Sequence, residues 1–88
     1  MPTISMFHGI IIRMYYGPKE HNPPHLHAYY QEFEATYDIY STELIDGDMP
    51  SSKNKLILAW MTIHKDELIA NWELCQNGEF PFKIEGLK

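Results

Sequence analysis

The chain has 88 residues, of which 44% are apolar, and this suits one small domain spanning residues 1–88 with a single hydrophobic core. Its formal charge of −5 disfavours direct nucleic-acid binding, because proteins that grip phosphates are usually basic. No stretch approaches the about 20 apolar residues of a membrane span, and the single cysteine, Cys75, fits a reducing cytoplasm, so we expect a cytoplasmic protein.

Strand-forming residues dominate the first half of the chain. Residues 10–16 read Ile-Ile-Ile-Arg-Met-Tyr-Tyr and predict a strand that ends at Gly17-Pro18. Residues 2–7 form either a further short strand or an ordered lead-in. From His25 to Tyr40 the alternation of apolar and polar residues predicts a hairpin, and a further short strand is expected at residues 42–45.

The register of the predicted hairpin follows if Gln31-Glu32 is its two-residue turn. One face then carries the apolar residues Leu26, Ala28, Tyr30, Phe33, Ala35, Tyr37 and Ile39. A slip of one residue would scatter this set over both faces, so the pattern supports the register. The turn chemistry is weaker, because neither Gln nor Glu favours the positive φ of a tight hairpin turn.

The second half of the chain reads as a helix. Ser51 or Ser52 can cap it, and neither Gly nor Pro interrupts it before Asn77-Gly78. Apolar positions recur at helical spacing, with Cys75 as a buried member: Ile57, Met61, His64, Leu68, Trp72 and Cys75. A straight helix of about 25 residues is about 37 Å long, so we expect its far end to bend or to project toward another chain. The prediction is an α+β fold, a sheet of three or four mainly antiparallel strands packed on one long C-terminal helix.

Three of the five histidines fall within residues 21–27, around Pro23-Pro24. A Pro-Pro step forces an extended backbone, so His25-Leu26-His27 is predicted to open a strand in which residues two apart share a face. The same register turns a polar set away from the core: His25, His27, Tyr29, Glu34, Thr36 and Asp38, with Arg13 and Tyr15 from the first strand. His25 then lies opposite Asp38.

Four interpretations of this polar face are open. It is the wetted side of an antiparallel sheet. It holds zinc or a similar divalent ion through His21, His25 and His27, or with Asp38 in place of His21. It carries acid–base or phosphate-binding chemistry, in which Asp38 raises the pKa of a histidine and Arg13 partners an anion. Or the imidazoles are architectural and bind the loop backbone. A guanidinium beside the cluster favours an anionic ligand over a metal cation.

Four segments of the chain carry a family resemblance. They are Pro2-Thr3-Ile4-Ser5, Gly9-Ile10-x-Ile12-x-Met14-Tyr15, His21-Asn22-Pro23-Pro24-His25-x-His27-Ala28 and Glu67-Leu68-x-x-Asn71-Trp72-Glu73-Leu74. Together they resemble a bacterial family catalogued as domain-of-unknown-function family 4160, over nearly the whole chain. Two positions depart from the family pattern: Glu20 stands where Asp is usual, and Gln31 stands where Gly is usual at the hairpin turn.

The resemblance implies a small cytoplasmic bacterial or phage-borne protein. Relatives are often encoded beside another small protein, and such pairs have been proposed as toxin–antitoxin-like modules. We therefore expect this chain to act by contact with a small cognate protein partner, and a homo-oligomer is also compatible with a projecting helix. The alternative is a His-dependent hydrolase or nuclease, or a metal-binding protein, centred on His25 and His27 with Asp38 and Arg13.

Overall fold

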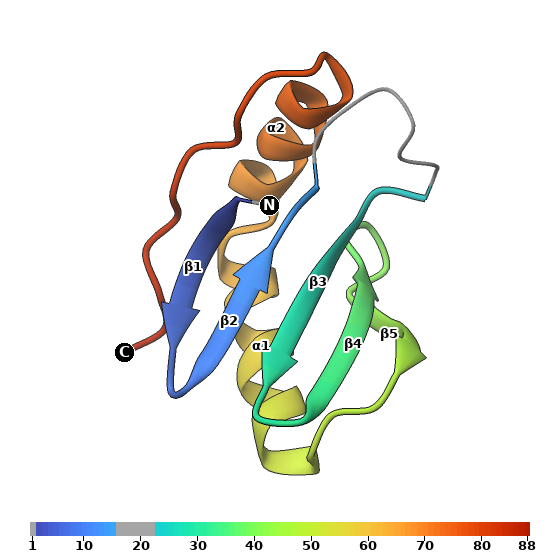
Figure 1. Cartoon of the computed structure of the whole chain (residues 1–88), viewed down its shortest axis with the longest axis vertical. Coiled ribbons are helices and arrows are strands. Elements are labelled where there is room, and N and C mark those ends of the chain that lie inside the picture. Colours follow the sequence, from blue (N-terminus) through green and yellow to red (C-terminus); the bar gives the residue numbers. More distant parts are fainter. Residues whose placement is uncertain (1, 16–22) are drawn as a thin grey trace.

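The computed structural model describes residues 2–15 and 23–88. Its elements are β1 (Thr3–Phe7), β2 (Ile10–Arg13), β3 (His25–Tyr30), β4 (Phe33–Asp38), β5 (Glu43–Gly47), α1 (Ser51–Ile63) and α2 (Lys65–Gln76). The strands form one antiparallel sheet in the order β1-β2-β3-β4-β5. Both helices lie against the same face of the sheet, so the opposite face, called the open face below, is free of helices (Figure 1).

The β1–β2 and β3–β4 hairpins close through tight turns. His8 and Gly9 both take positive φ values, 51° and 79°, as a two-residue turn between paired Phe7 and Ile10 requires. In the β3–β4 hairpin Tyr30 pairs with Phe33 and Leu26 with Tyr37, which confirms the predicted register. Gln31 adopts a φ of 52°, so the tight turn forms with a residue that pays a steric penalty there.

Alternation along the strands decides which side chains enter the core. The buried residues of β2, β3 and β4 meet those of the helices: Ile10, Ile12, Leu26, Ala28, Ala35 and Tyr37 pack with Ile57, Trp60, Met61, Leu68, Trp72 and Cys75. Cys75 is confirmed as a buried helix residue. Within the described part of the chain, neither helix has the length and apolar character that crossing a membrane requires.

The α+β class is confirmed, but two details of the prediction are wrong. Among the described residues the sheet has five strands rather than three or four, because residues 3–7 also pair with β2; the short strand expected at residues 42–45 is present as β5. The helical region is two helices, broken at His64, whose φ is −107° and ψ 24°. Thr62 Oγ1 donates to the Leu58 carbonyl, a bond that often bends helices, and His64 Nδ1 donates to Glu67 Oε1 at 2.5 Å.

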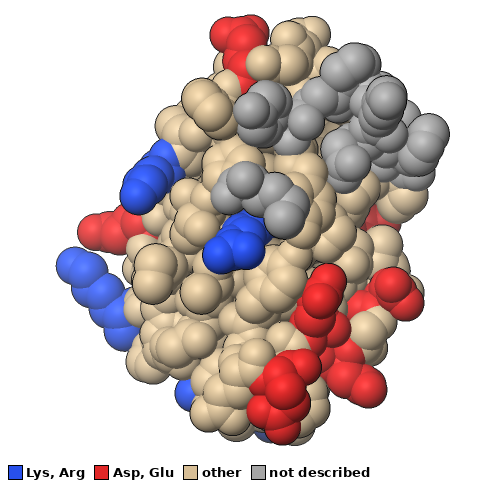
Figure 2. Space-filling view, in the orientation of Figure 1, with Lys and Arg blue, Asp and Glu red and all other residues tan. Residues whose placement is uncertain are grey.

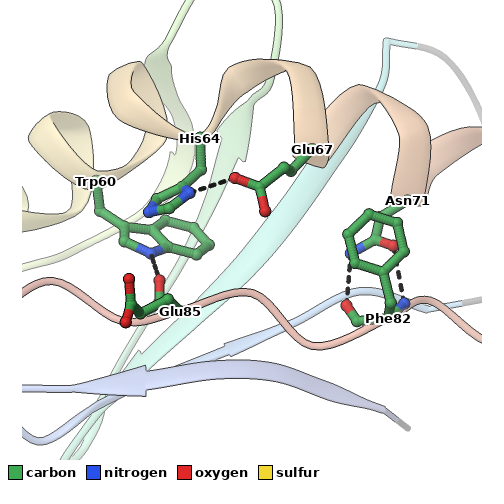
Figure 3. Close-up of polar contacts among 6 residues, drawn as sticks. All are labelled: Trp60, His64, Glu67, Asn71, Phe82 and Glu85. Atoms are coloured by element: carbon green, nitrogen blue, oxygen red, sulfur yellow. Dashed lines mark hydrogen bonds and ion pairs between the residues drawn. The ribbon is translucent and has the colours of Figure 1, made fainter.

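The C-terminal tail, residues 79–88, has no regular structure and runs along the outer side of β1 (Figure 1). Figure 3 shows the two helix side chains that hold it. The buried amide of Asn71 donates to the Phe82 carbonyl at 2.8 Å and accepts from the Phe82 N–H at 2.9 Å. Trp60 Nε1 donates to the Glu85 carbonyl at 2.8 Å, and Ile84 N–H donates to the Ile4 carbonyl at 2.7 Å. The tail therefore covers the edge of the sheet at β1.

Candidate functional site

The polar side chains of the open face form rows that cross the strands. The central row follows the strand pairing through Thr3, Arg13, His27, Thr36 and Asp46. Beside it, Tyr29 pairs with Glu34 on one side and His25 pairs with Asp38 on the other. The structure thus brings Arg13, His25, His27 and Asp38 to the same region of the sheet, as the alternation predicts.

His27 lies at the centre of a cluster of rings. The centroid of the Tyr15 ring is 4.5 Å from that of His27, and the His25 ring meets His27 edge-on at 5.2 Å. Thr36 Oγ1 lies 3.4 Å from His27 Nδ1. These contacts hold the imidazole in one orientation between β2 and β4, half-buried in the middle of the open face.

Arg13 and two tyrosines complete this ring cluster. Arg13 Cζ lies 5.2 Å from the centre of the Tyr29 ring, and its Nε donates to Thr3 Oγ1 at 3.4 Å. The hydroxyls of Tyr15 and Tyr29 share a hydrogen bond of 2.5 Å. Burial, and then the Tyr15 hydrogen bond, raise the pKa of Tyr29 above its ordinary value, so its hydroxyl stays protonated further into the alkaline range. Among the described residues Arg13 has no carboxylate within ion-pair distance.

Asp38 stands opposite His25 but serves the backbone. Its Oδ1 accepts hydrogen bonds from the N–H groups of Tyr40 and Ser41, at 2.9 and 3.0 Å. Asp side chains commonly shape turns in this way. The carboxylate therefore ends β4 and forms the turn into β5, and the predicted catalytic role of Asp38 gains no support from this geometry.

His25 connects the open face to helix α2. Its Nδ1 donates to the Pro23 carbonyl at 2.9 Å, which agrees with an architectural role in the approach to β3. Its ring also lies 5.1 Å from the Trp72 ring. His21, the third predicted metal ligand, falls outside the described residues. In residues 2–15 and 23–88, no group of three or more His, Cys, Asp or Glu side chains is placed to hold a metal ion, so the described residues alone do not fit a zinc site.

Charge is unevenly distributed over the molecule. No Lys or Arg occurs between Lys19 and Lys53. Five acidic residues of that stretch are exposed, and they lie in the β3–β4 turn, on β4, on β5 and directly after Gly47, the last residue of β5. We call them the acidic edge: Glu32, Glu34, Glu43, Asp46 and Asp48. Figure 2 shows a group of acidic side chains over β4 and β5. The sequence analysis missed this surface, although the long stretch without a basic residue is a signal for it.

A comparison with family models found one that matches residues 9–73, described as Domain of unknown function (DUF4160). The chain belongs to the DUF4160 family. This confirms the resemblance seen in the sequence, and the matched range contains Arg13, both histidines of β3 and the acidic edge. Comparisons with curated proteins and with solved structures found no match.

Proposed function

We propose that this DUF4160 protein acts by binding a protein partner, as one member of a two-protein module of the toxin–antitoxin type. The observation that supports this is the contrast between the two edges of the sheet. The tail covers β1, whereas β5 pairs with β4 alone among the described residues and is largely exposed. An open edge strand offers backbone groups and side chains to another chain.

The charges of the acidic edge select the kind of partner. Besides its five exposed carboxylates, this edge carries an apolar side chain, Ile45, which is 49% exposed at an irregularity between β4 and β5. Like charges placed against one another cost several kcal/mol, so this edge opposes pairing with a second copy of itself. A basic protein surface, by contrast, is attracted and oriented by it. A distinct, basic partner therefore agrees better with this edge than a homodimer does.

The test is recovery of the partner and its dependence on β5. A tagged chain is purified from its native cells, and a co-purifying small protein is identified, purified and titrated against wild type by calorimetry. We expect a stoichiometric complex that is lost in the double variant Glu43→Lys/Asp46→Lys. The control, Glu85→Lys, makes the same kind of charge change on the tail and should bind like wild type. Purifications that never contain a stoichiometric protein would refute the proposal.

A second function is supported by the ring cluster around His27. A guanidinium on the strand beside His27 is suited to an anionic ligand, and imidazoles transfer protons near neutral pH. On this basis the alternative is a hydrolase or nuclease of phosphate esters. Its test is hydrolysis of bis(p-nitrophenyl) phosphate, together with growth arrest on expression.

For this alternative, His25→Ala/His27→Ala should abolish both readouts while circular dichroism shows an unchanged fold. Glu34→Gln, a substitution on the same face, serves as the control and should retain both. Activity that survives the double histidine substitution would remove the alternative. A lower melting temperature without any change in activity or binding would assign the histidines an architectural role instead.

A further inference from the structure

An open groove of about 470 Å³ lies between the C-terminal end of α2 and the turn that joins β4 to β5. Its lining among the described residues combines apolar or aromatic surfaces with polar side chains: Pro24, Tyr40 and Trp72, and Glu73, Gln76 and Asn77. None of these residues is basic. The groove adjoins the acidic edge, because Tyr40 stands in the turn that leads into β5.

The described lining of the groove contributes negative charge from two sources, partly opposed by Lys65, whose Nζ donates to the Tyr40 carbonyl. Helix α2 ends at Gln76 without a basic residue in its last turn, so the partial negative charge of about −0.5 at its C-terminus is not compensated. Glu73, exposed in the same turn, adds a full negative charge. The final carbonyls are closed by backbone bonds, from Gly78 N–H to the Cys75 carbonyl and from Glu79 N–H to the Leu74 carbonyl. Backbone donors of the same chain thus already bind these carbonyls. The negative charge that remains favours a cationic ligand.

The aromatic walls of the groove are held in place before any ligand arrives. The Tyr40 N–H donates to Asp38 Oδ1, and the Tyr40 carbonyl accepts from Lys65 Nζ, while the Tyr40 side chain is 54% exposed. Trp72 is only 5% exposed and packs against the His25 ring. Because two hydrogen bonds fix its backbone, Tyr40 loses less backbone entropy on contact with a partner than an unanchored loop residue would. Such anchored aromatic residues often dominate binding energy at protein interfaces.

We propose that this groove binds the side chain of an arginine in a basic segment of the partner protein. The inference rests on the proposed protein-binding function and adds the place and the chemistry of recognition. A planar guanidinium stacks on aromatic rings and forms paired hydrogen bonds with carboxylate and amide oxygens, which Glu73, Gln76 and Asn77 supply. A nucleic acid is the wrong occupant, because its phosphates are repelled by Glu73 and by the adjoining acidic edge.

The test uses two peptides that differ only in charge. Acetyl-Gly-Arg-Gly-amide is titrated into ¹⁵N-labelled protein, and the matched peptide carries citrulline, a neutral residue of nearly the same shape. The two tryptophan indole signals report separately, because Trp60 Nε1 donates to the Glu85 carbonyl and does not line the groove. We expect the arginine peptide to shift the Trp72 signal and leave Trp60 unchanged, with affinity about tenfold above that of the citrulline peptide.

Variants then assign the binding to the groove. Glu73→Gln should weaken the arginine peptide about threefold, as the loss of one exposed ion pair does. Tyr40→Ala should also weaken it, whereas Tyr40→Phe keeps the ring and should bind like wild type. Glu85→Gln removes a charge from the tail and is the control that should change nothing. Equal shifts with both peptides, or full affinity in Glu73→Gln, would overturn the proposal.

The purified partner separates this proposal from the one on which it rests. A partner that binds wild type and Glu73→Gln equally, together with no peptide shift at Trp72, refutes the groove and leaves the protein-binding function intact. Selective arginine binding without any recoverable partner supports the groove and refutes the two-protein module. The protein could instead dimerise at high concentration, with Glu73→Gln abolishing the dimer. That result would identify a second copy of this chain as the occupant of the groove and overturn the proposal.

Discussion

Replacing Asn71 with leucine should release the C-terminal tail and lower the stability of the whole domain. Leucine has the same number and branching of side-chain heavy atoms, so the substitution removes the amide without leaving a cavity. Two hydrogen bonds to the backbone of Phe82 are lost. At a net value of about 1 kcal/mol each, the direct loss is about 2 kcal/mol, rising to about 4 kcal/mol if the Phe82 N–H and carbonyl stay buried without partners. In a domain of this size, 2 kcal/mol lowers the melting temperature by about 8–16 °C.

The assay is urea unfolding of wild type and Asn71→Leu, combined with amide hydrogen exchange. Exchange at Ile84 should accelerate more than exchange in β3, because the Ile84 N–H bonds to the Ile4 carbonyl only while the tail is docked. Asn77→Leu is the control, since Asn77 is exposed and its side chain makes no hydrogen bond with the described residues. A stability within 0.5 kcal/mol of wild type, or unchanged exchange at Ile84, would refute the idea that Asn71 anchors the tail.

Two further predictions concern the hairpin turn and a buried tyrosine. Gln31→Gly should raise the free energy of unfolding by about 1 kcal/mol, because glycine accepts the φ of 52° without strain. Glu32→Gly is the control: its φ is negative, so glycine there should lower the free energy of unfolding. Chemical denaturation measures both variants. Burial raises the pKa of Tyr37 to about 12, and its hydroxyl donates to Asn54 Oδ1 at 2.7 Å. Because the unfolded chain releases this proton above pH 10 and the folded chain retains it, stability should fall between pH 10 and 12, and Tyr37→Phe should flatten that fall in thermal melts at varied pH.

The central hairpin could be predicted from the sequence because its information is local. Leu26, Ala28 and Tyr30 alternate with polar residues, and a period of two assigns every side chain to one face once the turn is placed. The edge strand β5 lacks such a pattern, because four of the five residues of Glu43–Gly47 are exposed, so the strand expected at residues 42–45 obtains its register only by pairing with β4. The helix break at His64 could not be predicted from a Gly or Pro, because neither occurs there. His64 instead contacts Trp60 and Glu67, which its sequence neighbours do not reveal.

The candidate sites divide in the same way. The cluster of Arg13, His27 and Tyr29 follows from alternation in neighbouring strands, so it was predictable as soon as the strands were. The turn-forming role of Asp38 could not be predicted, because an Asp at a strand end can accept hydrogen bonds from the backbone or from an opposing side chain. The groove joins Tyr40 to Trp72, residues of different elements that only the packing of α2 on the sheet brings together.

His27 and Glu73 offer the cleanest separation between the two proposed functions. His25 cannot do so, because its ring contacts both His27 in the cluster and Trp72 beside the groove, so its removal disturbs both sites. His27→Ala alters the cluster without touching a residue of the groove, and Glu73→Gln does the reverse.

If the protein acts through its partner, Glu73→Gln should weaken the complex while His27→Ala keeps it. If it acts by chemistry on an anion, His27→Ala alone should abolish the activity. Each substitution is followed by calorimetry with the partner and by phosphodiester hydrolysis. Equal effects of both substitutions in both assays would mean that the two surfaces form one site, joined through His25.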